Sequence, residues 1–474
     1  MDWQDWQEDI FEQASKDNKL ILTFVTRDGC KLCDKMQNDE FAQIEKDLKD
    51  RFVFIKIDAD RQADIAKYMQ EISFELSNTK RGYPLSIFFA PDKTPLYDIG
   101  YATYHNSSSI MGLEESMELV LKGYYQAGDS FLQRGKEAIG SVNAFPTKIT
   151  ATKIDSNLIE IIKEQLIKLY DDQNGGFDDI PKFPRHQVLE LAVDIYKKDQ
   201  DSKIADIINS SIEKFWIGSL LDKSDNGFCQ CCLDKDCQEI DTAKRLCNNV
   251  LSVNLLLRAA KELDKSDFTN VALDSIEFIN NHMQIDGFYK SCKGSNQNIL
   301  LAHNAMVVEM LLDASEAKSH YKDIALDLLV DIQDRFMRGG QIYRYIGDGV
   351  EVEGLLDDYL YLASAMLRAY EISNEEHHKI KASEVINAIL KHFFNNGLWL
   401  YGVENDKIKA ISTDGECPSS IGAATQLLQK ASRLINSEYE KFYQRSIEIN
   451  SYEIMRQPIS VASLSRVALS SMMN

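Results

Sequence analysis

The N-terminal quarter of the chain alternates short apolar runs with amphipathic stretches. Three of the runs are short and rich in β-branched and aromatic residues, as buried strands are: LILTFVT at 20–26, RFVFIKID at 51–58 and LSIFFA at 85–90. Helical periodicity separates and flanks them, over about 3–17, 31–49, 60–72 and 113–140. A further short strand is expected near 96–99. This alternation of helix and strand predicts an α/β unit.

Beyond residue 150 the strand signals disappear, and we count about twelve helical segments. Among them a glycine turn followed by an apolar or aromatic residue recurs, with its key glycines at 176, 227, 287, 340 and 397. These glycines are 51, 60, 53 and 57 residues apart, and such a period marks a repeat whose units bury their apolar faces by stacking. Twelve helices arranged in this way predict six hairpins closed into an α/α toroid. An open solenoid is the competing geometry.

The bulk properties of the chain agree with two soluble domains. At 474 residues it exceeds the length at which a single hydrophobic core keeps growing. No apolar stretch approaches the roughly 18 residues of a membrane span. The acidic start of the sequence does not resemble a secretory signal, so we expect a cytoplasmic protein without membrane contacts. The formal net charge of −21 would repel phosphate backbones, which argues against nucleic acid as a partner.

The segment GCKLC places Cys30 and Cys33 where the first predicted strand gives way to a helix. At a helix N-terminus, free N–H groups and the positive end of the dipole stabilise a thiolate, and Lys31 adds positive charge nearby. We therefore expect Cys30 to be the nucleophile in thiol exchange and Cys33, one turn later, to resolve the mixed disulfide. The alternatives are a pair of zinc ligands or two core cysteines. A zinc site needs about four ligands, and no second Cys or His pair lies nearby in the N-terminal domain.

Several motifs, in this order, resemble the family that includes the spermatogenesis-associated thioredoxin-like proteins and their bacterial relatives. In the N-terminal part they are DWQDW, GCKLC, FIKIDADRQADI and GYPLSIFFAPDKTPLY. In the helical part they are GGFDDIPKFPR at 175–185, HNA at 303–305, GLLDDYLYL at 354–362 and TDGECPSS at 413–420. The resemblance implies a thioredoxin-like fold followed by an (α/α)6 toroid similar to six-hairpin glycosidases and sugar epimerases. It also implies that Pro84 is the cis-proline facing the dithiol, with an ordinary trans-proline at a strand start as the alternative.

We place the thioredoxin-like domain at 1–125, a helical linker at 126–150 and the toroid at 151–474. Two positions depart from thioredoxins. Phe24 stands where thioredoxins carry a buried acid that assists proton transfer, and Gly29 replaces the aromatic residue that usually precedes the first cysteine. These departures predict slow exchange.

In a toroid, each glycine hairpin leads to the start of the next inner helix, so residues at these starts should ring one mouth of the barrel. The polar residues at or near such starts are Arg185, His186, Asn248, Asn249, Asn304, Asp357, Asp358, Asp414 and Ser419. Paired carboxylates there could act as acid and base on a sugar. Helix capping is the alternative explanation, because local hydrogen bonds and the dipole favour Asp and Asn at helix N-termini.

Two observations argue against a complete catalytic or metal site in the toroid. The family's most distinctive helical motif carries a histidine and a glutamate, and this chain has Asp241 and Ala243 in their places. The cluster of Cys229, Cys231, Cys232 and Cys237 suffices in number for tetrahedral zinc, but its C-x-C-C-x4-C spacing lacks the two separated CxxC knuckles of common sites. We therefore expect no metal and no cofactor, and cysteines that are mostly reduced thiols.

The main functional hypothesis is a thiol–disulfide oxidoreductase-like protein that uses Cys30 and Cys33, with a toroid that binds a ligand or a client. The alternative is a carbohydrate-active or sugar-binding toroid, glycosidase-like or epimerase-like or a degenerate form of either, with the thioredoxin-like domain as a structural appendage. A non-catalytic interaction protein is the third hypothesis. The intact dithiol and the altered helical motif favour the first. The expected partners are a protein client that exchanges disulfides and a sugar-like small molecule in the toroid.

Overall fold

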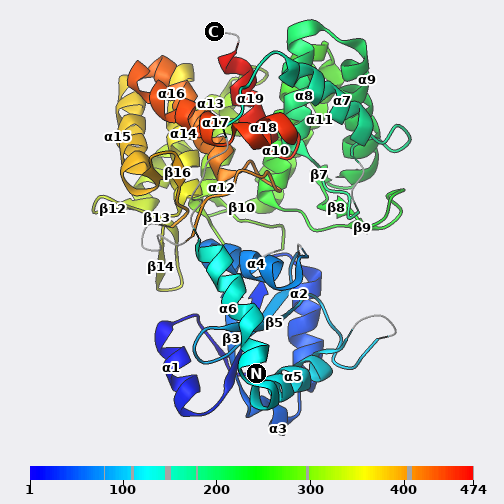
Figure 1. Ribbon diagram of the computed structural model, residues 1–474. Helices are drawn as coiled ribbons and strands as arrows, with labels where there is room; N and C mark the ends of the chain where they lie inside the picture. Colours follow the sequence, from blue (N-terminus) through cyan, green and yellow to red (C-terminus); the bar gives the residue numbers. More distant parts are fainter. Residues whose placement is uncertain are drawn as a thin grey trace. The chain divides into compact units, whose positions relative to one another are not determined.

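The computed structural model describes residues 1–79, 81–107, 111–144, 151–177, 180–294, 298–402 and 408–472. The chain divides into two compact units, Met1–Thr147 and Lys148–Asn474. The first combines a sheet with helices and the second is mostly helical (Figure 1). In the described ranges, no helix combines the length and the apolar character that a membrane crossing requires.

The first unit is built on a sheet whose described strands have the order β1-β3-β2-β4-β5. These strands are β1 (Trp3–Gln4), β2 (Leu20–Thr26), β3 (Phe52–Asp58), β4 (Leu85–Phe89) and β5 (Pro95–Ile99). Strands β1 and β2 run parallel to β3, whereas β4 is antiparallel to both β2 and β5. Strand β2 lies in the middle, with Leu22 opposite Phe54 on one side and Phe88 on the other. Its apolar run is therefore buried on both faces, which is why it does not alternate with polar residues.

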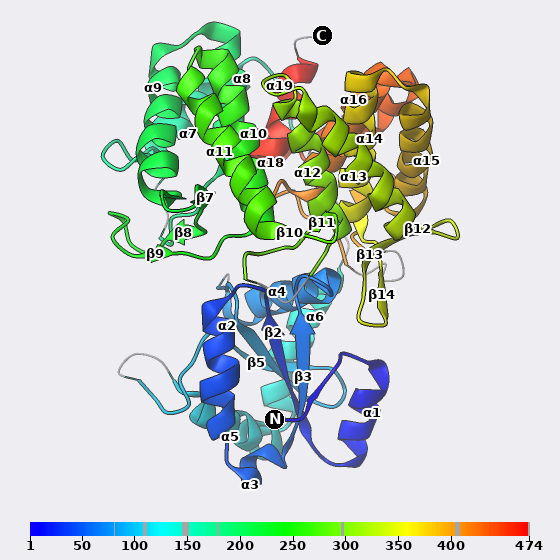
Figure 2. The same ribbon diagram turned by 180° about the vertical axis from the view of Figure 1, so that it is seen from behind.

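Helices cover both faces of this sheet (Figure 2). They are α1 (Glu8–Lys16), α2 (Lys31–Lys35), η1 (Met36–Glu40), η2 (Phe41–Gln43), α3 (Lys46–Lys49), α4 (Ala63–Ser77), α5 (Leu113–Lys122), η3 (Gly123–Ala127) and α6 (Asp129–Asn143). One core cluster joins β2 to Cys33 of α2 and Met117 of α5. The other joins the opposite face to Phe11 of α1, Met69 of α4 and Ala138 of α6.

Two helices differ from the predicted ones. The helix expected over 3–17 begins only at Glu8, because Trp3 belongs to β1 and packs against the rings of Phe24, Phe41 and Phe54. The helix expected over 31–49 is broken into α2, η1, η2 and α3. At the break, the buried carboxylate of Glu40 accepts hydrogen bonds from the backbone N–H of Tyr104 (2.8 Å) and from the hydroxyl of Tyr101 (3.1 Å). These contacts compete with a regular helix.

The segment expected to be a helical linker at 126–150 is largely a helix of the first unit. Helix α6 packs against α4 and β5, and its residues Ala138 and Val142 are buried in the core. The boundary between the units lies after Thr147.

In the described part of the second unit, six inner helices form a ring, and each pairs with an outer helix. The inner helices are α8 (His186–Asp199), α10 (Leu246–Leu263), α12 (Leu301–Ala314), α14 (Leu356–Ser373), α16 (Ser420–Leu434) and α19 (Ala462–Ser471). The outer helices are α7 (Asn157–Leu169), α9 (Ser202–Ser210) continued by η4 (Ser211–Leu220), α11 (Ser266–Met283), α13 (His320–Phe336), α15 (Glu376–His392) and α17 (Glu440–Ile449). Two short helices flank α17, η5 (Ser437–Tyr439) before it and α18 (Ser451–Arg456) after it. Each inner helix contacts the next, and α19 contacts α8. The ring is therefore closed, as in a toroid and unlike an open solenoid.

The recurring glycine turns form short antiparallel hairpins between consecutive helices. Their strands are β6 (Leu221–Asp222) with β7 (Gly227–Phe228), β10 (Gln284–Ile285) with β11 (Phe288–Tyr289), β12 (Met337–Arg338) with β13 (Gln341–Gly347), and β15 (Phe394–Asn395) with β16 (Leu398–Trp399). Strand β13 also pairs with β14 (Val350–Glu353), and β8 (Cys231–Cys232) pairs with β9 (Ile240–Asp241). Gly397 shows why the turns need glycine: its φ is +95°, and a Cβ atom there would lie 2.1 Å from Cδ1 of Ile449.

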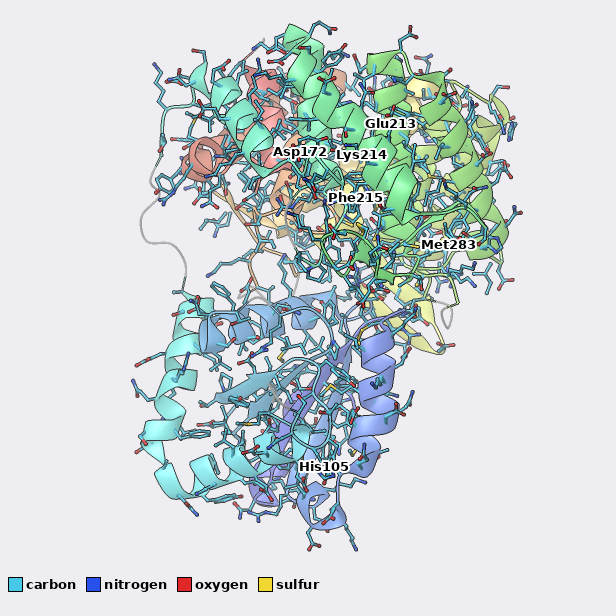
Figure 3. The ribbon with its side chains drawn as sticks, turned by 90° about the vertical axis from the view of Figure 1, so that its right-hand side faces the viewer. His105, Asp172, Glu213, Lys214, Phe215 and Met283 are labelled. Atoms are coloured by element: carbon cyan, nitrogen blue, oxygen red, sulfur yellow. A yellow bond between two sulfur atoms is a disulfide. The ribbon has the colours of Figure 1, made fainter. Side chains whose placement is uncertain are left out.

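The first glycine turn is held by a buried ion pair. The Asp171 carboxylate accepts a hydrogen bond from Nζ of Lys182 at 2.7 Å, and both side chains are almost fully buried. Burial by itself raises the pKa of Asp171, but the hydrogen bonds from Lys182 and from the turn outweigh it and hold the pKa at about 2. Nζ of Lys182 lies 5.2 Å from the ring centre of Phe215. Figure 3 shows Phe215 near Asp172 and Lys214, and Nζ of Lys214 donates to the carbonyl of Asp172 at 2.7 Å.

Two later turns are tied to the following inner helix by one asparagine each. In α12, Asn304 accepts a hydrogen bond from the backbone N–H of Tyr289 (2.8 Å) and donates to the carbonyls of Tyr289 and Leu300 (2.9 Å each). In α10, Asn249 makes the same set of bonds with Phe228 and with the carbonyl of Arg245. Both asparagines are fully buried. Each amide therefore fixes a hairpin strand to the start of the helix that follows.

We expect Asn304→Ala to lower the free energy of unfolding by about 2–3 kcal/mol, because it leaves buried backbone groups of Tyr289 without partners. Urea denaturation followed by circular dichroism measures the change. The matched control is Asn270→Ala on the exposed face of α11, where a change within about 0.5 kcal/mol is expected. Equal stability of the two variants would contradict a role for Asn304 in anchoring the hairpin.

Candidate functional site

The dithiol lies where the loop after β2 enters α2. Gly29 has φ +74°, a left-handed conformation that turns the chain toward the helix. Cys30 occupies the N-cap position of α2 with an extended backbone, and its sulfur accepts a hydrogen bond from the backbone N–H of Cys33 at 3.1 Å. The expected placement of Cys30 at a helix N-terminus is therefore present. A sulfur in this position receives the field of the helix start and one direct N–H donor, and both favour a thiolate.

Cys30 and Cys33 form a disulfide, with their Cα atoms 5.2 Å apart. The two sulfurs differ in access to solvent. Cys30 is half-buried, whereas Cys33 is fully buried in the core next to β2. Between them Leu32 keeps 49% of its surface exposed. In this arrangement the sulfur of Cys30 can react with an external partner, whereas the sulfur of Cys33 can react only with that of Cys30.

The loop before Cys30 is fixed by contacts from neighbouring segments. The backbone N–H of Asp28 donates to the carboxylate of Asp60 (3.2 Å), which also lies 3.6 Å from Nε of Arg27. The guanidinium of Arg27 lies 5.8 Å from the ring centre of Tyr83. The peptide bond between Tyr83 and Pro84 is cis, in agreement with what the family resemblance implies for Pro84. A role for Pro84 in exchange stays a prediction.

The interior beneath the dithiol is apolar at the position where thioredoxins carry an acid. Phe24 is fully buried and packs against the rings of Trp3 and Phe41. An ionisable side chain at this position is replaced by a hydrocarbon surface. Removal of the proton from buried Cys33 must therefore depend on other groups or on solvent, which agrees with the expectation of slow exchange.

The cysteines of the second unit are mostly free thiols, as expected from the sequence, with one exception. Cys232 and Cys237 form a second disulfide. Cys229 and Cys231 are buried free thiols. Burial raises the pKa of Cys229, and it raises that of Cys231 to about 12. Two sulfurs of the cluster thus form a disulfide, and burial favours the neutral thiol at the other two.

Most of the polar residues predicted at inner-helix starts are held by structural contacts. Asn304 anchors a hairpin, and Asn248 donates to the carbonyl of Cys229 at 3.2 Å. Asp358 is fully buried and pairs with Arg344 at 3.0 Å. It also accepts hydrogen bonds from the N–H groups of Leu355 and Ala302. Asp414 accepts hydrogen bonds from the N–H groups of Ser419 and Ser463. Asp357 accepts from the hydroxyl of Tyr401 (2.9 Å), and Arg185 precedes α8 at its N-cap. These contacts are of the kind that the alternative explanation, capping and turn anchoring, predicts, whereas Oδ1 of Asp357 and Oδ1 of Asn248 are buried without a hydrogen-bond partner among the described residues.

His186 is the one predicted pocket residue that lines a cavity of about 490 Å³ inside the ring. The cavity is surrounded by all of the inner helices described above. Polar residues lining it that the sequence analysis missed are Asn254, Glu309, Tyr361, Ser364 and Arg368. They lie one or more turns inside their helices and not at the starts. A charged residue within an otherwise apolar inner helix, such as Glu309 in MVVEMLL, is the signal that points to them.

The cavity wall carries charges that are mostly paired with one another. Arg258 of α10 and Arg466 of α19 both pair with Glu190 and Asp194 of α8. Across the cavity, Nε of Arg368 lies 2.6 Å from the carboxylate of Asp313. These ion pairs connect neighbouring inner helices.

A second group of polar atoms in the cavity is less completely satisfied. Burial raises the pKa of Glu309, whose carboxylate accepts a hydrogen bond from the hydroxyl of Ser364 at 2.6 Å. Burial also lowers the pKa of His186 to about 4, so its ring is neutral at pH 7. Nδ1 of His186, Oδ1 of Asn254 and the hydroxyl of Tyr361 have no hydrogen-bond partner among the described residues. These three atoms are buried, so a small molecule in the cavity would meet other polar atoms of its wall and not these.

Fold and site together define a protein with a thioredoxin-like domain carrying a CxxC disulfide, followed by a six-hairpin toroid with a polar central cavity. The family model Thioredox_DsbH, described as a protein of unknown function (DUF255), matches residues 1–143. An uncharacterized protein of Caenorhabditis elegans, B0495.5, is 26% identical over 235 residues, which are 48% of this chain and 32% of that protein. Human spermatogenesis-associated protein 20 is 23% identical over 205 residues, 40% of this chain and 25% of that protein. The resemblance found in the sequence is confirmed, and the matches span a third or less of these relatives.

The toroid is similar to three solved structures, each with a TM-score of 0.52. A sugar epimerase from a ruminal bacterium has 15% identity and covers 62% of this chain and 86% of that one. D-mannose isomerase has 11% identity and covers 69% and 100%. The α-1,6-mannanase GH76A of Salegentibacter sp. HEL1_6 has 13% identity and covers 66% and 98%. At these identities the likeness shows the fold alone, and it confirms the predicted fold class.

Cys30 is expected to be the most reactive cysteine of the reduced protein at pH 7. A brief iodoacetamide pulse, followed by mass-spectrometric mapping, should label Cys30 well before Cys229 and Cys231. A thiol with a pKa of about 12, as for Cys231, is ionised in only roughly one molecule in 10⁵ at this pH, whereas the N-cap position favours the Cys30 thiolate. Earlier labelling of Cys33, Cys229 or Cys231 would contradict the assignment of Cys30 as the nucleophile.

Proposed function

We propose that this protein is a thiol–disulfide oxidoreductase that acts on a protein client through Cys30 and Cys33. The observation that carries the proposal is the asymmetric pair at the start of α2: a half-buried Cys30 with an N–H donor on its sulfur and a fully buried Cys33 in disulfide contact with it. The match of residues 1–143 to a thioredoxin-like family model supports it.

The geometry supports the usual two steps of exchange. The Cys30 thiolate attacks one sulfur of a client disulfide, and the other client sulfur leaves as a thiolate. Cys33 then loses its proton, and its thiolate attacks the sulfur of Cys30, so that the second client sulfur leaves. The client gains two electrons and the dithiol becomes the Cys30–Cys33 disulfide. The exposed Leu32 beside Cys30 offers an apolar contact for the client.

The proposal predicts that the full-length protein catalyses the reduction of insulin disulfides by dithiothreitol. Cys30→Ser should abolish the acceleration, because it removes the nucleophile. Cys33→Ser should also abolish turnover but should accumulate a mixed disulfide at Cys30, since the resolving thiol is missing. Turbidity of the released insulin B chain and non-reducing electrophoresis measure the two effects.

The matched control is Cys417→Ser, a half-buried cysteine of the second unit, which should keep the wild-type rate. A wild-type rate equal to that of Cys30→Ser would show that the pair does not carry out exchange. The same assay tests whether Phe24 makes thiol–disulfide exchange slow. The variant Phe24→Asp introduces an ionisable group next to the dithiol and should raise the rate.

We propose as a second candidate function that the toroid binds a sugar-like small molecule. The supporting observation is the cavity of about 490 Å³, whose lining includes the polar side chains of Gln187, Ser364 and Gln426. Three structures of similar fold are named for enzymes that act on sugars. The proposal is limited to binding, because this chain has Asp241 and Ala243 where the family's distinctive helical motif carries a histidine and a glutamate.

Titration calorimetry with D-mannose and D-glucose tests this second function. Binding of either sugar should weaken about tenfold in Gln187→Leu, because Gln187 lines the cavity and one hydrogen bond of about 1–1.5 kcal/mol is lost while a side chain of similar size remains. The control Tyr452→Phe alters an exposed tyrosine and should leave the affinity unchanged. Absence of binding by both sugars, or equal affinity of both variants, would contradict the proposal.

A further inference from the structure

The second disulfide, Cys232–Cys237, lies at an exposed hairpin of the toroid unit. Strands β8 and β9 form the hairpin, with Cys232 opposite Ile240. Cys232 is fully buried, whereas Cys237 is half-exposed in the connecting loop. This difference in access is the same as that between Cys33 and Cys30. An approaching thiolate therefore meets the sulfur of Cys237 first.

Other contacts hold the hairpin in place, so the disulfide can open without loss of the fold. The backbones of Lys182 and Cys232 exchange two hydrogen bonds, of 2.7 and 3.0 Å. The carboxylate of Asp234 accepts from the backbone N–H groups of Gln238 (2.8 Å) and Glu239 (3.3 Å) and so closes the loop on itself. The two cysteines are only five positions apart, so their crosslink adds less chain-entropy stabilisation than one that closes a long loop.

An exposed leucine lies beside each of the two disulfides. Beside Cys30 lie a cation, Lys31, and the exposed Leu32. Beside Cys232 lies Leu233, which is 45% exposed, and the loop that follows carries acidic residues. These acids are Asp234, Asp236 and Glu239, with Lys235 as the single base of the loop. Because Asp34 also lies close to Cys30, the charge there is mixed, and the exposed leucines are the features that favour an encounter between the two sites.

The neighbouring free thiols cannot replace the pair as acceptors. Cys229, Cys231 and Cys247 are buried, and none of them forms a disulfide in the described chain. A thiol without a disulfide partner offers no sulfur–sulfur bond for attack. Cys232–Cys237 is thus the disulfide, outside the CxxC pair and among the described residues, that a dithiol in this protein can reduce.

We propose that the Cys232–Cys237 disulfide is a substrate of the Cys30–Cys33 dithiol, in the same chain or in a second copy of it. The inference rests on the proposed oxidoreductase function and names a partner for it. It makes the toroid unit a redox client of the thioredoxin-like unit.

The transfer starts from the reduced Cys30–Cys33 pair, which a dithiol reductant must first generate from the disulfide of the structure. The Cys30 thiolate attacks Sγ of Cys237, the Cys232–Cys237 bond breaks, and Cys232 leaves as a thiolate that takes up a proton. Cys33 loses its proton and attacks Sγ of Cys30, the mixed disulfide breaks, and Cys237 leaves as a thiolate. Two electrons pass from the Cys30–Cys33 dithiol, which becomes a disulfide, to Cys232 and Cys237, which become thiols.

The test follows the reduction of Cys232–Cys237 in the oxidised full-length protein under limiting dithiothreitol. Samples are quenched with acid, and each cysteine is counted by isotope-coded alkylation and mass spectrometry. We expect reduction of this pair to slow on the order of tenfold or more in the double variant Cys30→Ser, Cys33→Ser, because the internal relay is removed. The control Cys417→Ser should keep the wild-type rate. Equal rates in the wild type and the double variant would overturn the proposal.

A second measurement identifies the route. In Cys33→Ser, peptide mapping without reduction should find Cys30 linked to Cys237 or Cys232, in a monomer for transfer within one chain or in a dimer for transfer between copies. A link from Cys30 to any other cysteine would overturn the assignment. If Cys30–Cys33 cycles and reduces insulin while Cys232–Cys237 opens independently, the partner assignment alone fails. If Cys30–Cys33 does not cycle, the oxidoreductase function itself fails.

Discussion

The inner helices of the toroid can bury their apolar surfaces only when the ring closes, and ion pairs at the last junction help to close it. Arg466 of α19 pairs with Glu190 and Asp194 of α8, and Arg258 of α10 binds the same two carboxylates. Each carboxylate therefore meets two guanidinium groups from different helices. Inside a partly desolvated cavity such a network is strongly directional, so it selects one arrangement of α8, α10 and α19.

The closed ring also explains why its centre is polar. Six helix faces that meet around an axis leave a central space that their side chains do not fill, and the cavity of about 490 Å³ is the result. Paired charges occupy one side of its wall, and Glu309, Tyr361 and Asn254 occupy others. The first unit differs from the toroid because apolar side chains fill its interior. Its sheet is covered on both faces by helices, and the dithiol lies beyond the end of the central strand β2, where α2 begins.

Local signals carried most of what could be predicted from the sequence. The glycine period gave the hairpins of the toroid, and the CxxC at a strand-to-helix junction gave the N-cap position of Cys30. Features that depend on distant partners were missed. Glu40 breaks a helix because Tyr101 and Tyr104 lie above it, and Glu309 meets a cavity formed by other helices. The asparagines and aspartates at helix starts were ambiguous from sequence because capping and catalysis use the same residue types.

Closure between α8 and α19 has a consequence for synthesis. Helix α8 is among the first elements of its unit to leave the ribosome, and α19 is the last of the described inner helices. Until α19 emerges, the face of α8 that α19 will cover stays exposed to water. The thioredoxin-like unit, whose strands and helices all precede Thr147, has no such delay. During translation the chain should therefore pass through a stage with one finished domain and one incomplete ring, and the incomplete ring is the part whose apolar surface stays exposed.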